Sequence, residues 1–179
     1  MKIIIGLGNP GDKYTTTRHN AGFLAIDDFL KDKEVINCAS KFDAQICEYH
    51  EGATKMYFIK PQTFMNNSGK AVKEFLQFYK VDPKTELLVI HDDKDLSFGT
   101  IKTTTNSSGA GHNGVQDIID ELGTQEFNRI RIGVESRDPD SPIPTDVFVL
   151  QNFTDEELEK FKTDILPKVK IQIDEFLKR

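Results

Sequence analysis

The chain has 179 residues, a formal net charge of −6 and a hydrophobic content of 37%. This length predicts one domain, residues 1–179, large enough to bury a substantial core. The acidic balance argues against indiscriminate binding of nucleic acid, although it leaves room for a local basic patch.

No apolar run approaches the roughly 18 residues that a membrane span requires, and the apolar stretch at the N-terminus is too short for a signal peptide. The two cysteines, Cys38 and Cys47, have neither a metal-like spacing nor the pattern of a disulfide framework. We therefore expect reduced thiols, no membrane partner and a cytoplasmic location.

Strands alternate with helices along the chain. Strands are expected at Lys2–Leu7, Asp43–Tyr49, Met56–Ile59, Glu86–His91, Thr100–Thr105 and Arg129–Val134. Helices are expected around the apolar positions Phe23–Leu30, Val72–Tyr79, Val115–Leu122 and from about 154 to 178. This alternation predicts an α/β layered fold around a mostly parallel sheet. A hairpin through His50-Glu51-Gly52 makes that sheet mixed.

The last helix carries its own start signal. Thr154 and Glu157 form a T-x-x-E capping box, and Pro167 is expected to kink or break the helix. Its charged side is most simply a solvated face, with a partner-binding surface as the alternative. The Pro-containing segment Ser136–Thr145 is the longest expected loop.

The first strand runs into "GLGNPG", which contains the dinucleotide-binding pattern G-x-G-x-x-G at Gly6, Gly8 and Gly11. A dinucleotide site also requires a helix that begins within the glycines and an acidic residue at the end of the second strand. Here a turn and a run of threonines follow instead, and Asp27 and Asp28 fall on the first helix. We expect the glycines to shape a tight turn that presents Asn9 and leads on to His19.

Polar side chains collect at the ends of the expected elements: His19-Asn20, Asn66-Asn67-Ser68, His91-Asp92-Asp93 and His112-Asn113. In an open α/β sheet, such segments can converge beyond the carboxyl ends of the strands. Singly, Asn67 or Ser68 could cap the second helix and Asn113 the third. Together, a histidine and a carboxylate form the pair that general-base catalysis uses, and asparagines suit amides, sugar hydroxyls and a developing oxyanion.

The sequence has neither a G-x-S-x-G elbow nor a P-loop. With no cysteine or serine elbow among the polar residues, water is the natural nucleophile, so the residues suggest hydrolysis of an ester or related acyl bond. A metal site is the main competitor. Its ligands would come from His91, Asp92, Asp93, Asp95 and His112, although no established ligand spacing is present.

Five blocks, in order, resemble the bacterial peptidyl-tRNA hydrolases: "GLGNPGDKYTTTRHNAGF", "KPQTFMNNSGKAV", "HDDKDLSFGTIK", "GAGHNGVQDII" and "FNRIRIGV". The resemblance covers about residues 1–150. It implies a single compact three-layer α/β sandwich with a mixed central sheet. It also implies hydrolysis of the ester between a nascent peptide and the 3′ ribose of tRNA, with peptidyl-tRNA as the partner, no metal or organic cofactor, and a monomer as the simplest assembly.

The resemblance also implies roles for single residues. His19 corresponds to the family's catalytic base and Asp92 to the carboxylate that orients it. Asn9, Asn66 and Asn113 correspond to substrate-positioning asparagines. The remaining implied site residues are Tyr14 and Met65 in the cleft, His112 as a secondary candidate, and Arg131 on the tRNA phosphate.

This sequence departs from the family's patterns near the implied tRNA contacts. The family's H-D-E-L-D-L-P is His91-Asp92-Asp93-Lys94-Asp95-Leu96-Ser97 here, and a basic residue used on phosphate is replaced by Thr104, which leaves Lys102 as a substitute. Two other functions remain open. One is a non-catalytic RNA-binding relative, and the other is a metal-dependent phosphoesterase built on His91-Asp92-Asp93.

Overall fold

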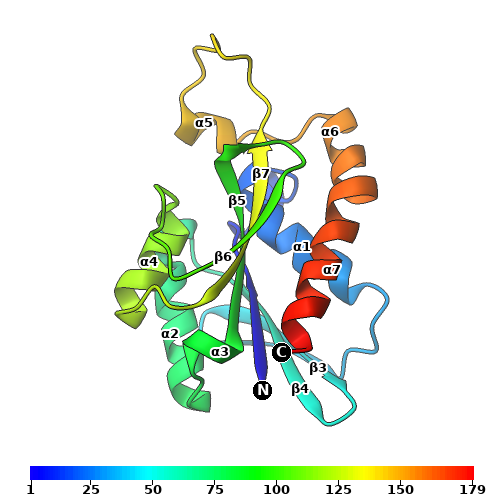
Figure 1. The fold of residues 1–179 in the computed structure, drawn as a ribbon, viewed down its shortest axis with the longest axis vertical. Coiled ribbons are helices and arrows are strands. Elements are labelled where there is room, and N and C mark those ends of the chain that lie inside the picture. The colour runs from blue at the N-terminus through cyan, green and yellow to red at the C-terminus, as the bar shows by residue number, and fades with distance from the viewer.

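The computed structural model describes residues 1–179 and has one seven-stranded sheet at its centre (Figure 1). In spatial order its strands are β2 (Asn37–Lys41), β3 (Ala44–Glu51), β4 (Thr54–Pro61), β1 (Lys2–Gly6), β5 (Leu87–Ser97), β7 (Asn128–Glu135) and β6 (Ile101–Thr105). The pairs β1–β4, β1–β5 and β5–β7 are parallel, and the pairs β2–β3, β3–β4 and β6–β7 are antiparallel. The predicted mixed sheet is confirmed, with parallel pairs at its centre and antiparallel pairs toward both edges.

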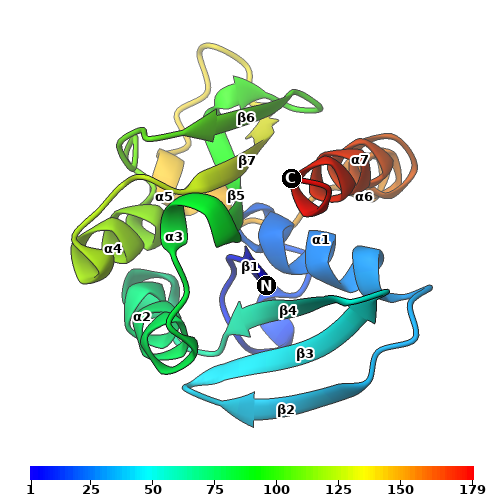
Figure 2. The same ribbon diagram turned by 60° about the horizontal axis from the view of Figure 1, so that its bottom comes forward.

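Helices cover both faces of the sheet (Figure 2). They are α1 (Ala21–Leu30), α2 (Ser68–Tyr79), α3 (Pro83–Glu86), α4 (Asn113–Leu122), α5 (Thr145–Val149), α6 (Asp155–Lys160) and α7 (Leu166–Leu177). Short 3-10 turns lie at Asp12–Tyr14, Arg18–Asn20 and Met65–Asn67.

The alternation of side chains along β1 produces the three layers. Ile4 packs in a cluster with residues of α1 and α7, whereas Ile3 and Ile5 pack on the opposite face with residues of α2 and α4. Since successive side chains of a strand point to opposite faces, three consecutive isoleucines supply both cores. The chain is therefore the α/β sandwich that its sequence predicts.

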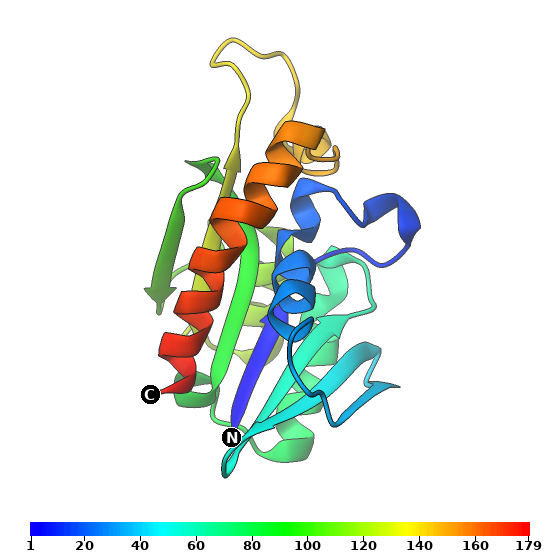
Figure 3. The same cartoon turned by 90° about the vertical axis from the view of Figure 1, so that its right-hand side faces the viewer.

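The C-terminal helix is present, and it contains an irregularity where proline was expected to disturb it. The capping box is formed, because Thr154 Oγ1 accepts from the backbone N–H of Glu157 and the Glu157 carboxylate accepts from that of Thr154. Between α6 and α7 lies a π-helical turn, Phe161–Ile165, just before Pro167. The segments run on as one rod along the sheet (Figure 3), so the proline perturbs the helix without ending it.

The edge strand β2 was not predicted, and it changes the account of the cysteines. Every residue of β2 is exposed, so the strand carries no hydrophobic pattern. The two-residue turn Phe42-Asp43, with both φ angles positive, returns the chain as β3. Cys38 then lies opposite Cys47, and the two form a disulfide. The prediction of reduced thiols is therefore wrong in this structure. The cysteines no longer support a reducing compartment.

The glycines of the first loop serve the packing of α1 against β1. A Cβ on Gly6 would meet the carbonyl oxygen of Gly22, and one on Gly8 would lie 2.6 Å from the Phe23 ring. Only Gly11 needs a positive φ, of 106°. The predicted turn therefore accounts for Gly11 alone, whereas Gly6 and Gly8 let the helix approach the strand closely.

Gly22 provides the clearest test of this packing. A Cβ there would meet backbone atoms of Leu7 and Ile90, which cannot move aside as a flexible side chain would. Helix propensity alone predicts that Gly22→Ala stabilises the fold by about 1 kcal/mol. We expect instead a loss of about 3 kcal/mol in the free energy of unfolding, measured by urea denaturation.

Gly52→Ala is the matched control, because its Cβ would meet nothing within 4 Å and only its φ of 59° opposes the change. We expect a loss of about 1 kcal/mol there. A Gly22→Ala protein as stable as the wild type would refute the close packing of α1 on β1.

Candidate active site

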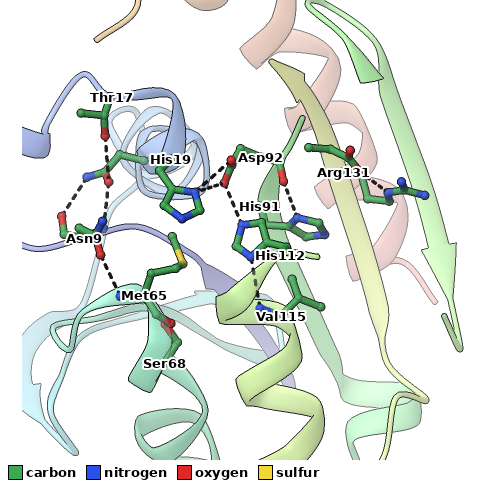
Figure 4. A network of polar contacts seen from close by, with 12 residues as sticks. Asn9, Thr17, His19, Met65, Ser68, His91, Asp92, His112, Val115 and Arg131 are labelled. Atoms are coloured by element: carbon green, nitrogen blue, oxygen red, sulfur yellow. Dashed lines mark hydrogen bonds and ion pairs between the residues drawn. The ribbon is translucent and has the colours of Figure 1, made fainter. Parts of the chain in front are cut away.

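The polar segments converge at the carboxyl ends of the parallel strands. His19 lies in the 3-10 turn that leads from β1 into α1, Asp92 lies in β5, and His112 precedes α4. Figure 4 shows the three side chains meeting in one network. This is the place where an open α/β sheet gathers a ligand, as the sequence predicted.

Asp92 is the centre of this network. Its side chain is 2% exposed, and its carboxylate accepts hydrogen bonds from two histidines. His19 Nδ1 lies 2.9 and 3.0 Å from the two carboxylate oxygens, and His112 Nε2 lies 2.9 Å from Oδ1. A carboxylate buried this deeply is tolerated because both rings donate to it.

The remaining bond of His112 fixes its tautomer. His112 is the N-cap of α4, and its Nδ1 accepts the backbone N–H of Val115 at 3.3 Å. The neutral ring therefore carries its proton on Nε2, toward Asp92. Both nitrogens of His112 are engaged, so this ring has no lone pair left for a substrate or a water.

His19 is in the opposite situation. Its Nδ1–H donates to Asp92, and this leaves the Nε2 lone pair unengaged by the protein. The ring is 13% exposed and borders the cavity described below. Of the two histidines on Asp92, only His19 is arranged to accept a proton, and His19 is the residue that the family resemblance implies as the base.

The electrostatics of the cluster agree with this arrangement. Burial alone would lower the pKa of His19, but the charge and hydrogen bond of Asp92 outweigh it and hold that pKa above its ordinary value. Burial alone would raise the pKa of Asp92, but His19 and His112 hold it far below its usual range. Asp92 is thus a carboxylate throughout the neutral range, and it stabilises a proton on His19.

His91 is a neutral structural neighbour of the cluster. It is buried, its Nδ1 donates to the backbone carbonyl of Asp92 at 2.7 Å, and its ring packs edge-on against His112. Burial, helped by the proximity of His112, lowers the pKa of His91 to about 3. His91 helps to hold the strand and ring in place and does not titrate near neutral pH.

A cavity of about 380 Å³ opens beside these residues. It is lined by His19, His91, Asp92, Asp93, Lys94, Gly109, Ala110, Gly111, His112, Asn113, Thr145, Asp146 and Val149. Of the predicted site residues, this cavity brings together His19, Asp92, His112 and Asn113. It does not include Asn9, Tyr14, Met65 or Asn66.

Asn9 belongs to a second, adjoining network. Its side-chain carbonyl accepts the backbone N–H of Met65 at 2.8 Å, so one of its two polar groups joins the β1 loop to the β4 loop. Asn20 holds Asn9 in turn, accepting from its backbone N–H and donating to its backbone carbonyl. The amide NH₂ of Asn9 remains for a ligand, and Asn20, which we did not predict as a site residue, positions it.

Met65 and Tyr14 lie close to this second network. Met65 is buried against Gly114, where a Cβ would come within 2.5 Å of its sulfur. Tyr14 is half-buried and packs edge-on against the exposed Phe64. Met65 therefore sets the spacing between α4 and the β4 loop, and Tyr14 and Phe64 form an aromatic edge beside it.

The capping interpretations of the asparagines are wrong. Asn67 precedes α2 without a side-chain capping bond, and the Ser68 hydroxyl donates to the carbonyl of Met65. His112, and not Asn113, caps α4. The side chains of Asn66 and Asn113 are both exposed and make no hydrogen bond to the rest of the chain, so they are free for a ligand.

The two predicted phosphate contacts lie side by side on the antiparallel pair β6–β7, where Lys102 stands opposite Arg131. Lys102 is exposed, whereas Arg131 Nε donates to Asp93 at 2.6 Å. The pairing with Asp93 uses one edge of the guanidinium. Its two terminal nitrogens make no bond within the chain.

Two buried arginines escaped the sequence analysis. Arg18, 5% exposed, donates to the carbonyls of Gln151 and Asn152 and to the carboxylate of Glu157, and so joins the turn carrying His19 to the start of α6. Arg129 donates to the carbonyls of Ser107 and Ser108, just before the loop that leads to His112. Their partners are backbone carbonyls and, for Arg18, one carboxylate, all distant in the sequence or without a side-chain signal, so no local pattern predicts these contacts.

The geometry disfavours the metal alternative. The three side chains whose ligand atoms lie within 4.8 Å of one another are His19, Asp92 and His112, a different set from the one expected. A neutral His112 that bound a metal through Nε2 would carry its proton on Nδ1, directly against the N–H of Val115. That contact between two donors makes His112 a poor ligand while α4 is capped.

The pKa of His19 tests the network directly. In the wild type we expect the pKa of His19 to lie above 6.5. An NMR titration of the ring protons measures it. In Asp92→Asn, the main cause of the increase is lost while burial remains, so the value should fall below 6.5. His50, exposed on β3, serves as the internal control. An unchanged His19 titration in Asp92→Asn would contradict the proposed coupling.

Comparison with known proteins agrees with this geometry. A family model described as peptidyl-tRNA hydrolase matches residues 3–179. The peptidyl-tRNA hydrolase of Fusobacterium nucleatum is 42% identical over 179 residues, which cover 96% of this chain and 91% of that one. That of Mycoplasma capricolum is 45% identical over 162 residues, covering 90% and 86%.

Among solved structures, the peptidyl-tRNA hydrolase of Acinetobacter baumannii superposes with a TM-score of 0.83 at 31% identity, covering 99% of this chain and 93% of that one. Separately, none of the helices is long and apolar enough to cross a membrane. The family model, the related sequences and the fold agree, and the chain belongs to the peptidyl-tRNA hydrolase family.

Proposed function

We propose that the protein hydrolyses the ester between a peptide and the 3′ ribose of tRNA, with His19 as general base. The observation that carries this proposal is the pair of bonds on Asp92: of the two histidines that donate to it, only His19 keeps an unengaged ring nitrogen, Nε2. No serine or cysteine nucleophile lines the cavity, so water is the attacking group.

In the first step, a water bound at His19 Nε2 attacks the ester carbonyl while the ring accepts one of its protons. Asp92 stabilises the imidazolium that forms. In the second step, the tetrahedral intermediate collapses, the bond to the ribose oxygen breaks, and the imidazolium returns its proton to that oxygen. The products are a peptide with a free carboxyl group and a tRNA with a free 3′ hydroxyl.

Asn113 is the proposed stabiliser of the oxyanion. It is the first residue of α4, borders the cavity and has an unpaired side-chain amide. The N-terminus of a ten-residue helix adds partial positive charge at the same place. Asn9 and Asn66 are proposed to position the substrate with their free amide groups, beside Tyr14 and Met65.

The proposed tRNA contacts are Lys102 and the outer edge of Arg131. With a net charge of −6, such contacts must be local, and affinity should fall as salt rises. Because one chain supplies the whole cluster, we propose that a monomer is the working unit. We propose that it acts in the cytoplasm without a metal or organic cofactor.

Release of peptide from a purified peptidyl-tRNA tests the proposal. The wild type should release peptide, and His19→Ala should lose on the order of 10²-fold or more in kcat, because the base is removed. His50→Ala is the control, since His50 is exposed and pairs only with Glu48 on β3. Equal rates for wild type and His19→Ala would overturn the assignment of His19. A wild type that binds tRNA but releases no peptide would favour a binding protein.

A further inference from the structure

Resting on this proposed function, we propose that Lys94 binds the phosphodiester that precedes the terminal nucleoside of the substrate. Hydrolysis would then depend on the charge of that one phosphate as well as on the ester. The proposal makes Lys94 a substrate-binding residue of the cavity, distinct from Lys102 and Arg131 on β6–β7.

Lys94 is the only lysine or arginine among the residues that line the cavity. It follows Asp92 by two residues on β5, so the two backbone positions lie about 7 Å apart along the strand. Its side chain runs along the wall of the cavity, and its Cε would lie 3.8 Å from a Cβ placed on Gly111. The ammonium group is therefore within reach of the chemistry at His19 and Asp92.

Three carboxylates line the cavity with Lys94: Asp92 and Asp93 are engaged by other groups, and Asp146 makes no ion pair with Lys94. Asp92 accepts from two histidines, and Asp93 accepts from Arg131 and from the backbone N–H of Asp95. The one partner of Lys94 is Asp95, at 2.9 Å, and the two side chains are 35% and 57% exposed. An exposed ion pair of this kind contributes about 0–1 kcal/mol, so a phosphate can replace Asp95 at little cost.

The chemistry of the substrate indicates that the group bound by Lys94 is a phosphate. The ester is carried by the ribose of the terminal nucleoside, and the phosphate on the 5′ side of the same ribose is the anion nearest to it. A peptide of neutral residues offers no competing charge. Lysine is suited to such a contact, because its ammonium acts as a compact charge on a flexible stem.

Two neutral-peptide substrates that differ by one cytidine 3′-phosphate unit, which carries the phosphodiester in question, provide the test. They are the N-acetyl-leucyl ester of adenosine and the same ester of the dinucleotide cytidylyl-adenosine, compared as the ratio of their kcat/KM values. The wild type should prefer the dinucleotide, and Lys94→Met should reduce that preference by roughly tenfold, the scale of one charged contact. Lys94→Arg should keep most of it. Lys31→Met, an exposed lysine paired with Asp28 at the far end of α1, should keep the wild-type ratio.

The outcomes separate this inference from the function on which it rests. A wild type that cleaves neither ester would count against the proposed function. A wild type that cleaves both, with the same ratio in Lys94→Met, would overturn the role of Lys94 alone. Replacing leucine by aspartate in the adenosine ester tests the competing occupant. If Lys94→Met lowers only the rate on the aspartyl ester, the lysine binds acidic peptide and the phosphate assignment is wrong.

Discussion

The site depends on a single buried carboxylate. Asp92 lies in the central part of the sheet, where an isolated charge would be costly, and it is tolerated because His19 and His112 both donate to it. Each donation fixes the tautomer of the ring that makes it. His19 is left with a free lone pair on Nε2, whereas the lone pair of His112 accepts the N–H of Val115, so only His19 can act as the base.

The fold supplies the rigid supports for this carboxylate. β5 carries Asp92, the close packing of α1 against β1 sets the turn of His19, and the capping bond to Val115 aims His112. Because His112 caps α4 with Nδ1, its proton lies on Nε2 and is donated to Asp92. The buried arginines, Arg18 and Arg129, tie the surrounding loops to distant backbone carbonyls and reduce their freedom to move.

The sequence predicts the parts of this protein that have a local signal. The continuous isoleucine run of β1, the periodicity of α2 and α4 and the capping box at Thr154 each identified an element correctly. His19 and Asp92 were singled out because polar residues at the ends of elements converge in such folds, and the family resemblance supplied the roles predicted for them. The disulfide was missed because β2 has no buried face, and His112 was not recognised as a cap because histidine rarely fills that role.

The protonated nitrogen of each ring is the quantity on which the account rests, and nitrogen-15 NMR of the imidazole side chains measures it. At a pH above the titration of His19, we expect a proton on Nδ1 of His19 and on Nε2 of His112. A proton on Nε2 of His19 under the same conditions would leave no lone pair for water. That result would contradict its role as the general base.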